Sequence, residues 1–153
     1  MNTTVKTKIR NIENKDCDCV FNMMREFYNS PAVICKASDE TLLADIKACL
    51  SNSPYIEGFI FEAESETAGY AMLAKGFSTE AGGVCIQVED IYLKPEFRGF
   101  GIGKEFFKFM ENRYKGTAVR LRLEVEASNT RAIEVYKKSG YEELPYMQMI
   151  KEL

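Results

Sequence analysis

Histidine is absent from the 153-residue chain. Ser-His-Asp and Cys-His catalytic groups both need an imidazole, and so does every metal motif with a histidine ligand. These classes of enzyme and of metal site are therefore excluded. Any proton transfer has to use carboxylates, tyrosines, thiols, amines or water.

The sequence also lacks a Cys-x-x-Cys motif, and its number of cysteines is odd. Its five cysteines are Cys17, Cys19, Cys35, Cys49 and Cys85. The first two stand two residues apart in an expected helix, where such neighbours point in different directions. The pattern disfavours a zinc site and a disulfide framework, and it predicts reduced thiols in a cytoplasmic protein that binds no metal.

Long apolar runs are missing as well. No run of about 20 apolar residues is present, so no membrane association through a spanning helix is predicted. Residues 1–6 lack the apolar segment of a signal peptide. A net charge of −3 argues against nucleic acid as the main partner and mildly favours a cationic substrate. A hydrophobic fraction of 46% predicts a single domain over residues 1–153, with a substantial core.

The spacing of apolar residues predicts a mixed α/β fold. Strands are expected at 5–12, 58–63, 68–75, 84–94 and 119–126, with two short final strands at 142–144 and 146–150. Helices are expected at 16–28, 39–50, 102–115 and 129–140. This order describes a central, largely antiparallel sheet flanked by helices on both faces. The strands at 84–94 and 119–126 should be parallel, because a helix connects them.

The stretch 98–104 reads Arg-Gly-Phe-Gly-Ile-Gly-Lys and joins an expected strand to an expected helix. Glycine lets the backbone approach a bulky anion closely and adopt left-handed angles. The first N–H groups of a helix have no intrahelical partner, and the helix dipole is positive there. This combination predicts a site for a phosphate or pyrophosphate.

The glycine spacing rules out two common phosphate loops. Arg98 occupies the first glycine position of a Walker A loop and Glu105 its Ser/Thr position, while Lys104 replaces the third glycine of a dinucleotide fingerprint. The remaining pattern, R-x-x-G-x-G with Gly101 and Gly103, resembles the acetyl-CoA loop of the GNAT superfamily of N-acetyltransferases. The resemblance implies that the backbone amides of this loop hold the pyrophosphate of coenzyme A.

A second segment, Asn129 to Tyr141, resembles the GNAT motif that follows the fifth strand. Asn129, Ala132 and Tyr136 fall on one stripe of a helix. The resemblance implies that Asn129 contacts the pantetheine arm and that the Tyr136 hydroxyl protonates the departing thiolate. Tyrosine suits this step because its pKa of about 10 keeps the proton in place at neutral pH. The alternative is that Tyr136 is only a packing aromatic.

A third signal is the pair Glu89-Asp90 in the long strand. With the glycine loop it resembles the spermidine/spermine (diamine) N-acetyltransferase branch, which implies that Glu89 is the general base. Asp90 would then be structural or a second charge at the amine site. Direct removal of a proton from an alkylammonium by a glutamate costs roughly 8 kcal/mol at ordinary pKa values, so Glu89 would act through a water or as the amine attacks. The alternative is a solvated strand carboxylate.

The resemblance implies direct acetyl transfer from acetyl-CoA to a primary amine, with a small-molecule amine such as a polyamine as acceptor. The expected catalytic residues are Glu89 and Tyr136. The expected acetyl-CoA-binding residues are Ile91, Tyr92, Leu93, Arg98, Gly99, Phe100, Gly101, Ile102, Gly103, Lys104, Asn129 and Tyr136. Residues 28–36 are expected to set substrate choice. A non-catalytic acyl-CoA-binding module, a peptide or protein acetyltransferase, and a homodimer all stay open.

Overall fold

The computed structural model describes residues 5–153 and contains one five-stranded sheet in the order β1-β2-β3-β4-β5. The strands are β1 (Thr7–Asn11), β2 (Ile56–Ala63), β3 (Glu66–Ser78), β4 (Gly83–Leu93) and β5 (Arg120–Leu123). The helices are α1 (Cys17–Tyr28), α2 (Asp39–Leu50), α3 (Ile102–Tyr114) and α4 (Thr130–Lys138), with short 3-10 turns η1 (Asn14–Asp16) and η2 (Pro95–Phe97). Within residues 5–153, no helix combines the length and apolar character needed to cross a membrane.

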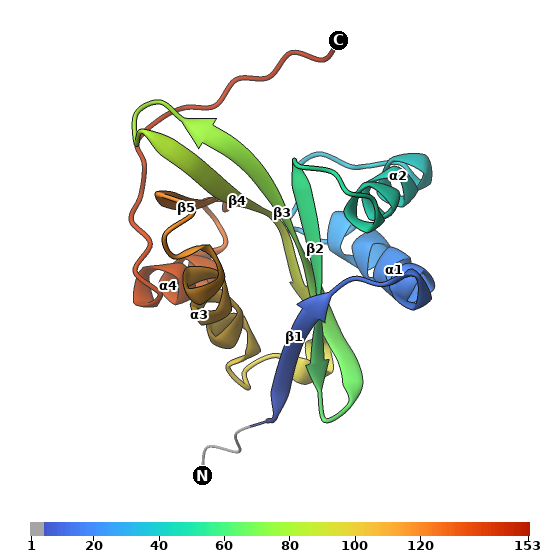
Figure 1. The fold of residues 1–153 in the computed structure, drawn as a ribbon. Helices are drawn as coiled ribbons and strands as arrows, with labels where there is room; N and C mark the ends of the chain where they lie inside the picture. The colour runs from blue at the N-terminus through green and yellow to red at the C-terminus, as the bar shows by residue number, and fades with distance from the viewer. Residues whose placement is uncertain (1–4) are drawn as a thin grey trace.

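Helices cover both faces of the sheet, with α1 and α2 on one side and α3 and α4 on the other (Figure 1). The alternation of β2 shows how the sheet divides the core. Phe59 and Phe61 pack in one buried cluster with Phe106 of α3, whereas Ile60 between them packs in the other with Met24 of α1. Successive strand residues point to opposite faces, so an apolar run in the central strands feeds both layers. The predicted mixed α/β class is confirmed.

Strands β1 to β4 pair antiparallel, and β4 and β5 pair parallel, as expected. The parallel ladder is short, from Cys85 opposite Arg120 to Val88 opposite Leu123. The register of β3 and β4 shifts at this point: Leu73 lies opposite Val88 and Met72 opposite Asp90. Glu89 is therefore the extra residue of a β-bulge, which bends the strand and ends local pairing. For this reason β5 stops at Leu123 rather than at residue 126, where the sequence predicted its end.

The two predicted final strands do not form. Residues 142–153 are extended and run past the β3–β4 hairpin before leaving the body of the molecule (Figure 1). No backbone hydrogen bond connects this segment to the rest of residues 5–153. Apolar composition predicted strands here, but a strand needs a partner to pair with, and no strand among residues 5–153 bonds to this segment.

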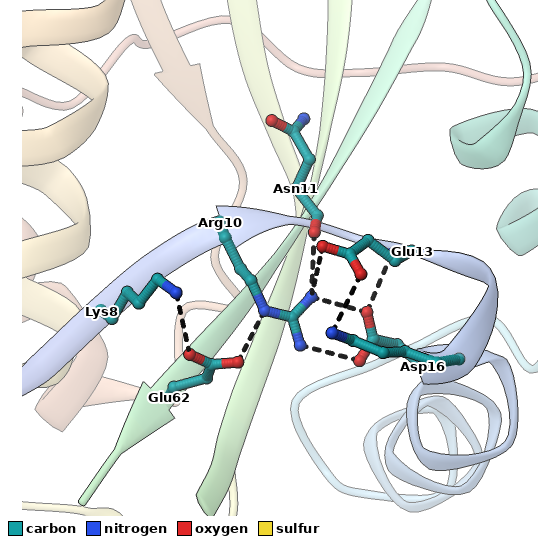
Figure 2. Close-up of polar contacts among 7 residues, drawn as sticks. Lys8, Arg10, Asn11, Glu13, Asp16 and Glu62 are labelled. Atoms are coloured by element: carbon teal, nitrogen blue, oxygen red, sulfur yellow. Dashed lines mark hydrogen bonds and ion pairs between the residues drawn. The ribbon is translucent and has the colours of Figure 1, made fainter. Parts of the chain in front are cut away.

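A charge network ties β1 to the start of α1 (Figure 2). The Arg10 guanidinium donates to both carboxylate oxygens of Asp16, at 2.7 and 2.9 Å, and its Nε donates to Glu62 of β2 at 2.6 Å. Asp16 also accepts from the Glu13 backbone N–H at 2.8 Å. The hydrogen bond from Arg10 lowers the pKa of Asp16. The network fixes the chain reversal between the sheet and its first helix.

Candidate active site

The end of the β4–β5 ladder creates a cleft. Beyond Val88 and Leu123 the two strands no longer pair, and a cavity of about 540 Å³ lies between them. Its walls are the second half of β4, Leu123 at the end of β5 with residues 124–126 after it, the start of α4, and the end of α1 with residues 30–32. Because a missing stretch of sheet leaves backbone groups free on both sides, such a gap can accept an extended ligand.

Glu89 lies at this cleft, and the bulge sets it apart from its neighbours. The residue is exposed and lines the cavity, whereas Val88 and Asp90 on either side are buried. Partial burial of its carboxyl raises the pKa of Glu89, and the charges of Glu124 and Asp45 add to the effect. A carboxylate at the edge of a cleft whose pKa lies above its ordinary value is a stronger base than a solvated one, which suits it to accept a proton.

Asp90 faces the α1–α2 layer and is only 3% exposed. The Tyr28 and Tyr70 hydroxyls each donate a hydrogen bond to its carboxylate at 2.9 Å. Burial raises the pKa of Asp90 to about 6, although these two hydrogen bonds oppose the shift. Local sequence pattern could not reveal this cluster, because its members come from α1, β3 and β4.

Tyr136 and Asn129 lie at the cleft on α4 and just before it. The Tyr136 ring packs edge-on against Phe107, with the ring centres 5.6 Å apart. Burial raises the pKa of Tyr136, so the hydroxyl holds its proton at neutral pH. Asn129 caps α4: its side-chain oxygen accepts from the Ala132 N–H at 3.3 Å, which leaves the side-chain amide free to donate.

The glycine loop runs directly from the cleft into α3. Gly99 and Gly101 have φ of +88° and +84°, left-handed values that favour glycine. In the described chain, the backbone N–H groups of residues 99–104 have no hydrogen-bond acceptor. The next N–H group along the chain, that of Glu105, donates to the Gly101 carbonyl. A side chain at Gly103 would meet nothing within 4 Å, so the backbone there is open to a ligand.

Arg98 stands between the loop and the cleft. Its Nε donates to the Leu93 carbonyl at 2.8 Å, and its guanidinium lies 5.6 Å from the centre of the Tyr92 ring. These contacts hold the side chain against the end of β4 and leave its terminal nitrogens available. A row of free amides at a helix N-terminus beside an arginine matches the chemistry of a pyrophosphate. The loop therefore fits the diphosphate of coenzyme A.

The structure brings most of the predicted site residues together around one cavity. These are Glu89, Ile91, Tyr92, Leu93, Arg98, Asn129 and Tyr136. Residues 99–104 lie outside the cavity wall and continue from its edge as the α3 cap; the Ile102 side chain is buried in the core, so only its backbone can face a ligand. The sequence did not identify Phe27 and residues 123–126 as walls, since both depend on where β4 and β5 separate.

Comparison with known proteins agrees with this geometry. Residues 20–141 match the model of the Acetyltransferase (GNAT) family. The chain is 32% identical over 147 residues to thialysine N-epsilon-acetyltransferase of Bos taurus, covering 89% of this chain and 84% of that protein. It is 29% identical over 141 residues to a Bacillus subtilis (strain 168) protein named as a ribosomal protein bS18-alanine N-acetyltransferase, covering 88% and 80%.

A solved structure extends the agreement to the fold. AAC(6')-Iy, determined with a CoA-containing bisubstrate analogue, superposes with a TM-score of 0.78 at 18% identity, covering 97% of this chain and 99% of that one. The sequence motifs at the glycine loop and at α4 predicted the same family. The chain belongs to the GNAT family of acetyltransferases.

Proposed function

We propose that this enzyme transfers an acetyl group from acetyl-CoA directly to the primary amine of a small cationic molecule. One observation carries the proposal: a carboxylate and a phenol, Glu89 and Tyr136, line the same cleft where β4 and β5 separate. The free amides of the α3 cap lead into that cleft. A base and an acid on one cavity beside a pyrophosphate loop form the minimal set for acyl transfer to an amine.

Bound acetyl-CoA would supply the acetyl thioester, held by the amides of residues 99–104, by Arg98 and by the side-chain amide of Asn129. The backbone groups of residues 91–93 that face the cleft and do not bond to β3 would align its pantetheine arm, as a neighbouring strand would. Glu89 takes the proton that the amine loses, directly or through a water. Tyr136 gives its proton to the thiolate that leaves. No covalent bond to the enzyme is needed.

The charges around the cleft favour a cationic acceptor. Glu89 and Asp45 form no ion pair with any described Lys or Arg, and Asp90 is bound only by tyrosine hydroxyls. Uncompensated carboxylates attract a cation and repel an anion. The similarity to a thialysine acetyltransferase, whose named substrate is a small amine, supports the same class of acceptor.

A peptide acceptor is the second candidate. It is favoured by the similarity to the protein named as a bS18-alanine acetyltransferase, whose acceptor would be the amino group of an alanine. A peptide needs an open approach to the cleft. On the side of the α1–α2 layer, the cavity is bounded by the end of α1 and by residues 30–32. The two acceptors therefore have to be separated by turnover.

The test is release of free CoA thiol from acetyl-CoA over a panel of thialysine, spermidine, an aminoglycoside and a peptide beginning with alanine. Turnover of thialysine or spermidine above the peptide supports the proposal. Turnover of the peptide alone would assign the second candidate. Stabilisation by acetyl-CoA with no thiol release from any amine would show a binding module instead. The Tyr136→Phe variant serves as the matched control for enzymatic turnover.

A further inference from the structure

Arg98 carries its charge to the edge of the cleft without losing it to a neighbouring carboxylate. It forms no ion pair with any Asp or Glu among residues 5–153, and its guanidinium makes one hydrogen bond there, from Nε to the Leu93 carbonyl at 2.8 Å. An exposed arginine side chain has many rotamers, and ordering it when a ligand binds costs free energy. A guanidinium that is already held in place avoids this cost, so the groups that hold Arg98 affect how tightly a diphosphate binds.

The ring of Tyr92 is the support on which Arg98 lies. The guanidinium carbon is 5.6 Å from the ring centre, within the range of a cation–π contact. Tyr92 is only 7% exposed, and the rings of Phe27 and Tyr70 pack against it with centres 6.4 and 6.2 Å away. A ring confined by two other rings has little freedom to move, so it gives the guanidinium a fixed surface.

Glu26, near the end of α1, holds the far end of the Tyr92 side chain. The Tyr92 hydroxyl donates a hydrogen bond to the Glu26 carboxylate, which is exposed and forms no ion pair with any Lys or Arg among residues 5–153. Burial and this hydrogen bond raise the pKa of Tyr92 to about 12, so the phenol keeps its proton and stays the donor. A hydroxyl that donates to an anion is polarised, which makes the ring more attractive to a cation.

The three side chains stand in series, and their order has a chemical consequence. A direct ion pair between Glu26 and Arg98 would occupy the terminal nitrogens of the guanidinium and cancel its charge. Because the neutral Tyr92 ring lies between them, the carboxylate can fix the arginine while these nitrogens stay available. The arrangement therefore orders a cation and keeps its charge for a ligand.

We propose that Glu26 is a positioning residue for the diphosphate of acetyl-CoA: through the Tyr92 hydroxyl it fixes the ring that supports Arg98 beside the phosphate loop. The inference rests on the proposed use of acetyl-CoA, and it adds to that site a residue of α1 that lies outside both sequence motifs. Glu26 does not contact the ligand itself.

The Kd for CoA, measured by isothermal titration calorimetry, tests this role. Glu26→Gln should raise the Kd about fivefold, the order expected when one cation–π support is weakened, because a neutral amide is a poorer acceptor for the phenol. Charge alone predicts the opposite sign, since removing a carboxylate favours the binding of an anion. Asp18→Asn, at another exposed carboxylate of α1, is the matched control and should leave the Kd unchanged. An unchanged or lowered Kd for Glu26→Gln would overturn the proposal.

A double-mutant cycle tests whether the effect passes through Tyr92 and Arg98. Tyr92→Phe removes only the hydroxyl and should raise the Kd as much as Glu26→Gln does, with no further rise when both are changed. In an Arg98→Met background, Glu26→Gln should change the Kd by less than about twofold. Additive effects of Glu26→Gln and Tyr92→Phe, or an undiminished effect without Arg98, would show that Glu26 acts by another route and would refute the proposal.

A donor without the diphosphate separates positioning from a general effect on the fold. With acetyl-CoA and the best acceptor of the amine panel, Glu26→Gln should raise the KM for the donor and leave kcat unchanged. With acetyl-pantetheine, its kcat/KM should equal that of the unaltered chain, and a loss with both donors would contradict the positioning role. An unaltered chain that does not bind CoA would end the proposed function and this inference together. Equal binding of CoA by the unaltered chain and Glu26→Gln would end this inference alone.

Discussion

Replacing Asp90 by asparagine should change how stability depends on pH. Burial raises the pKa of Asp90 from 3.8 to about 6. The folded chain therefore keeps a proton that the unfolded chain has already released, so the free energy of unfolding falls as pH rises through this window. A shift of about two pKa units, at about 1.36 kcal/mol each, amounts to roughly 3 kcal/mol. The loss is complete once the pH exceeds the folded pKa.

Asp90→Asn removes this titration and still offers one acceptor and one donor group to the hydroxyls of Tyr28 and Tyr70. The free energy of unfolding of the variant, relative to that of the unaltered chain, should rise by roughly 3 kcal/mol as the pH increases from about 4 to about 7. Urea unfolding followed by far-ultraviolet circular dichroism measures this, since the chain has no tryptophan. Asn22→Ser, at an exposed uncharged residue on α1, is the control and should leave the shape of the curve of stability against pH unchanged. Parallel stability curves for Asp90→Asn would refute the argument.

Three further substitutions test the site and the fold. Tyr136→Phe should lower kcat by about a hundredfold with the Kd for acetyl-CoA unchanged, and an unaltered kcat would remove its role as acid. Glu89→Gln should lower kcat/KM by about a hundredfold, most at low pH where unprotonated amine is scarce; a profile of unchanged shape would argue against a base at this position. Arg10→Met should reduce the free energy of unfolding by about 3 kcal/mol, because the Asp16 carboxylate, 8% exposed, loses its guanidinium. Adding Asp16→Asn should restore part of that stability, and equal urea midpoints for all three chains would show that the network contributes nothing.

Much of the fold could be predicted because its signals are local. Helix caps, the glycine loop and the alternation in β2 are encoded by residues close together in the chain. Ser38 accepts from the Thr41 N–H and Asn129 from the Ala132 N–H, both as side-chain caps do. The same locality explains why the spacing of residues 98–104 is sufficient to locate the phosphate loop.

The failures lie where pairing decides the outcome. Residues 142–150 have strand composition, but composition does not say whether another strand pairs with them, and none among residues 5–153 does. Likewise, the alternation in residues 119–126 continues past Leu123, yet pairing stops there because β4 bulges at Glu89. A bulge has no local sequence signature in this strand, since it is a property of the register between two strands.

The bulge also explains how two adjacent carboxylates receive different environments. Regular alternation would already place Glu89 and Asp90 on opposite faces. The extra residue decides which side each one takes, because it makes Val88 and Asp90 neighbours in the ladder and leaves Glu89 out of register at the cleft. Val88 packs in the cluster with Phe106, whereas Asp90 accepts a hydrogen bond from Tyr70 of the other cluster. Asp90 is then buried and bound by two tyrosines, while Glu89 stays exposed at the point where β5 separates. One irregularity in β4 thus opens the cavity and also supplies its carboxylate, so removing the bulge should abolish both together.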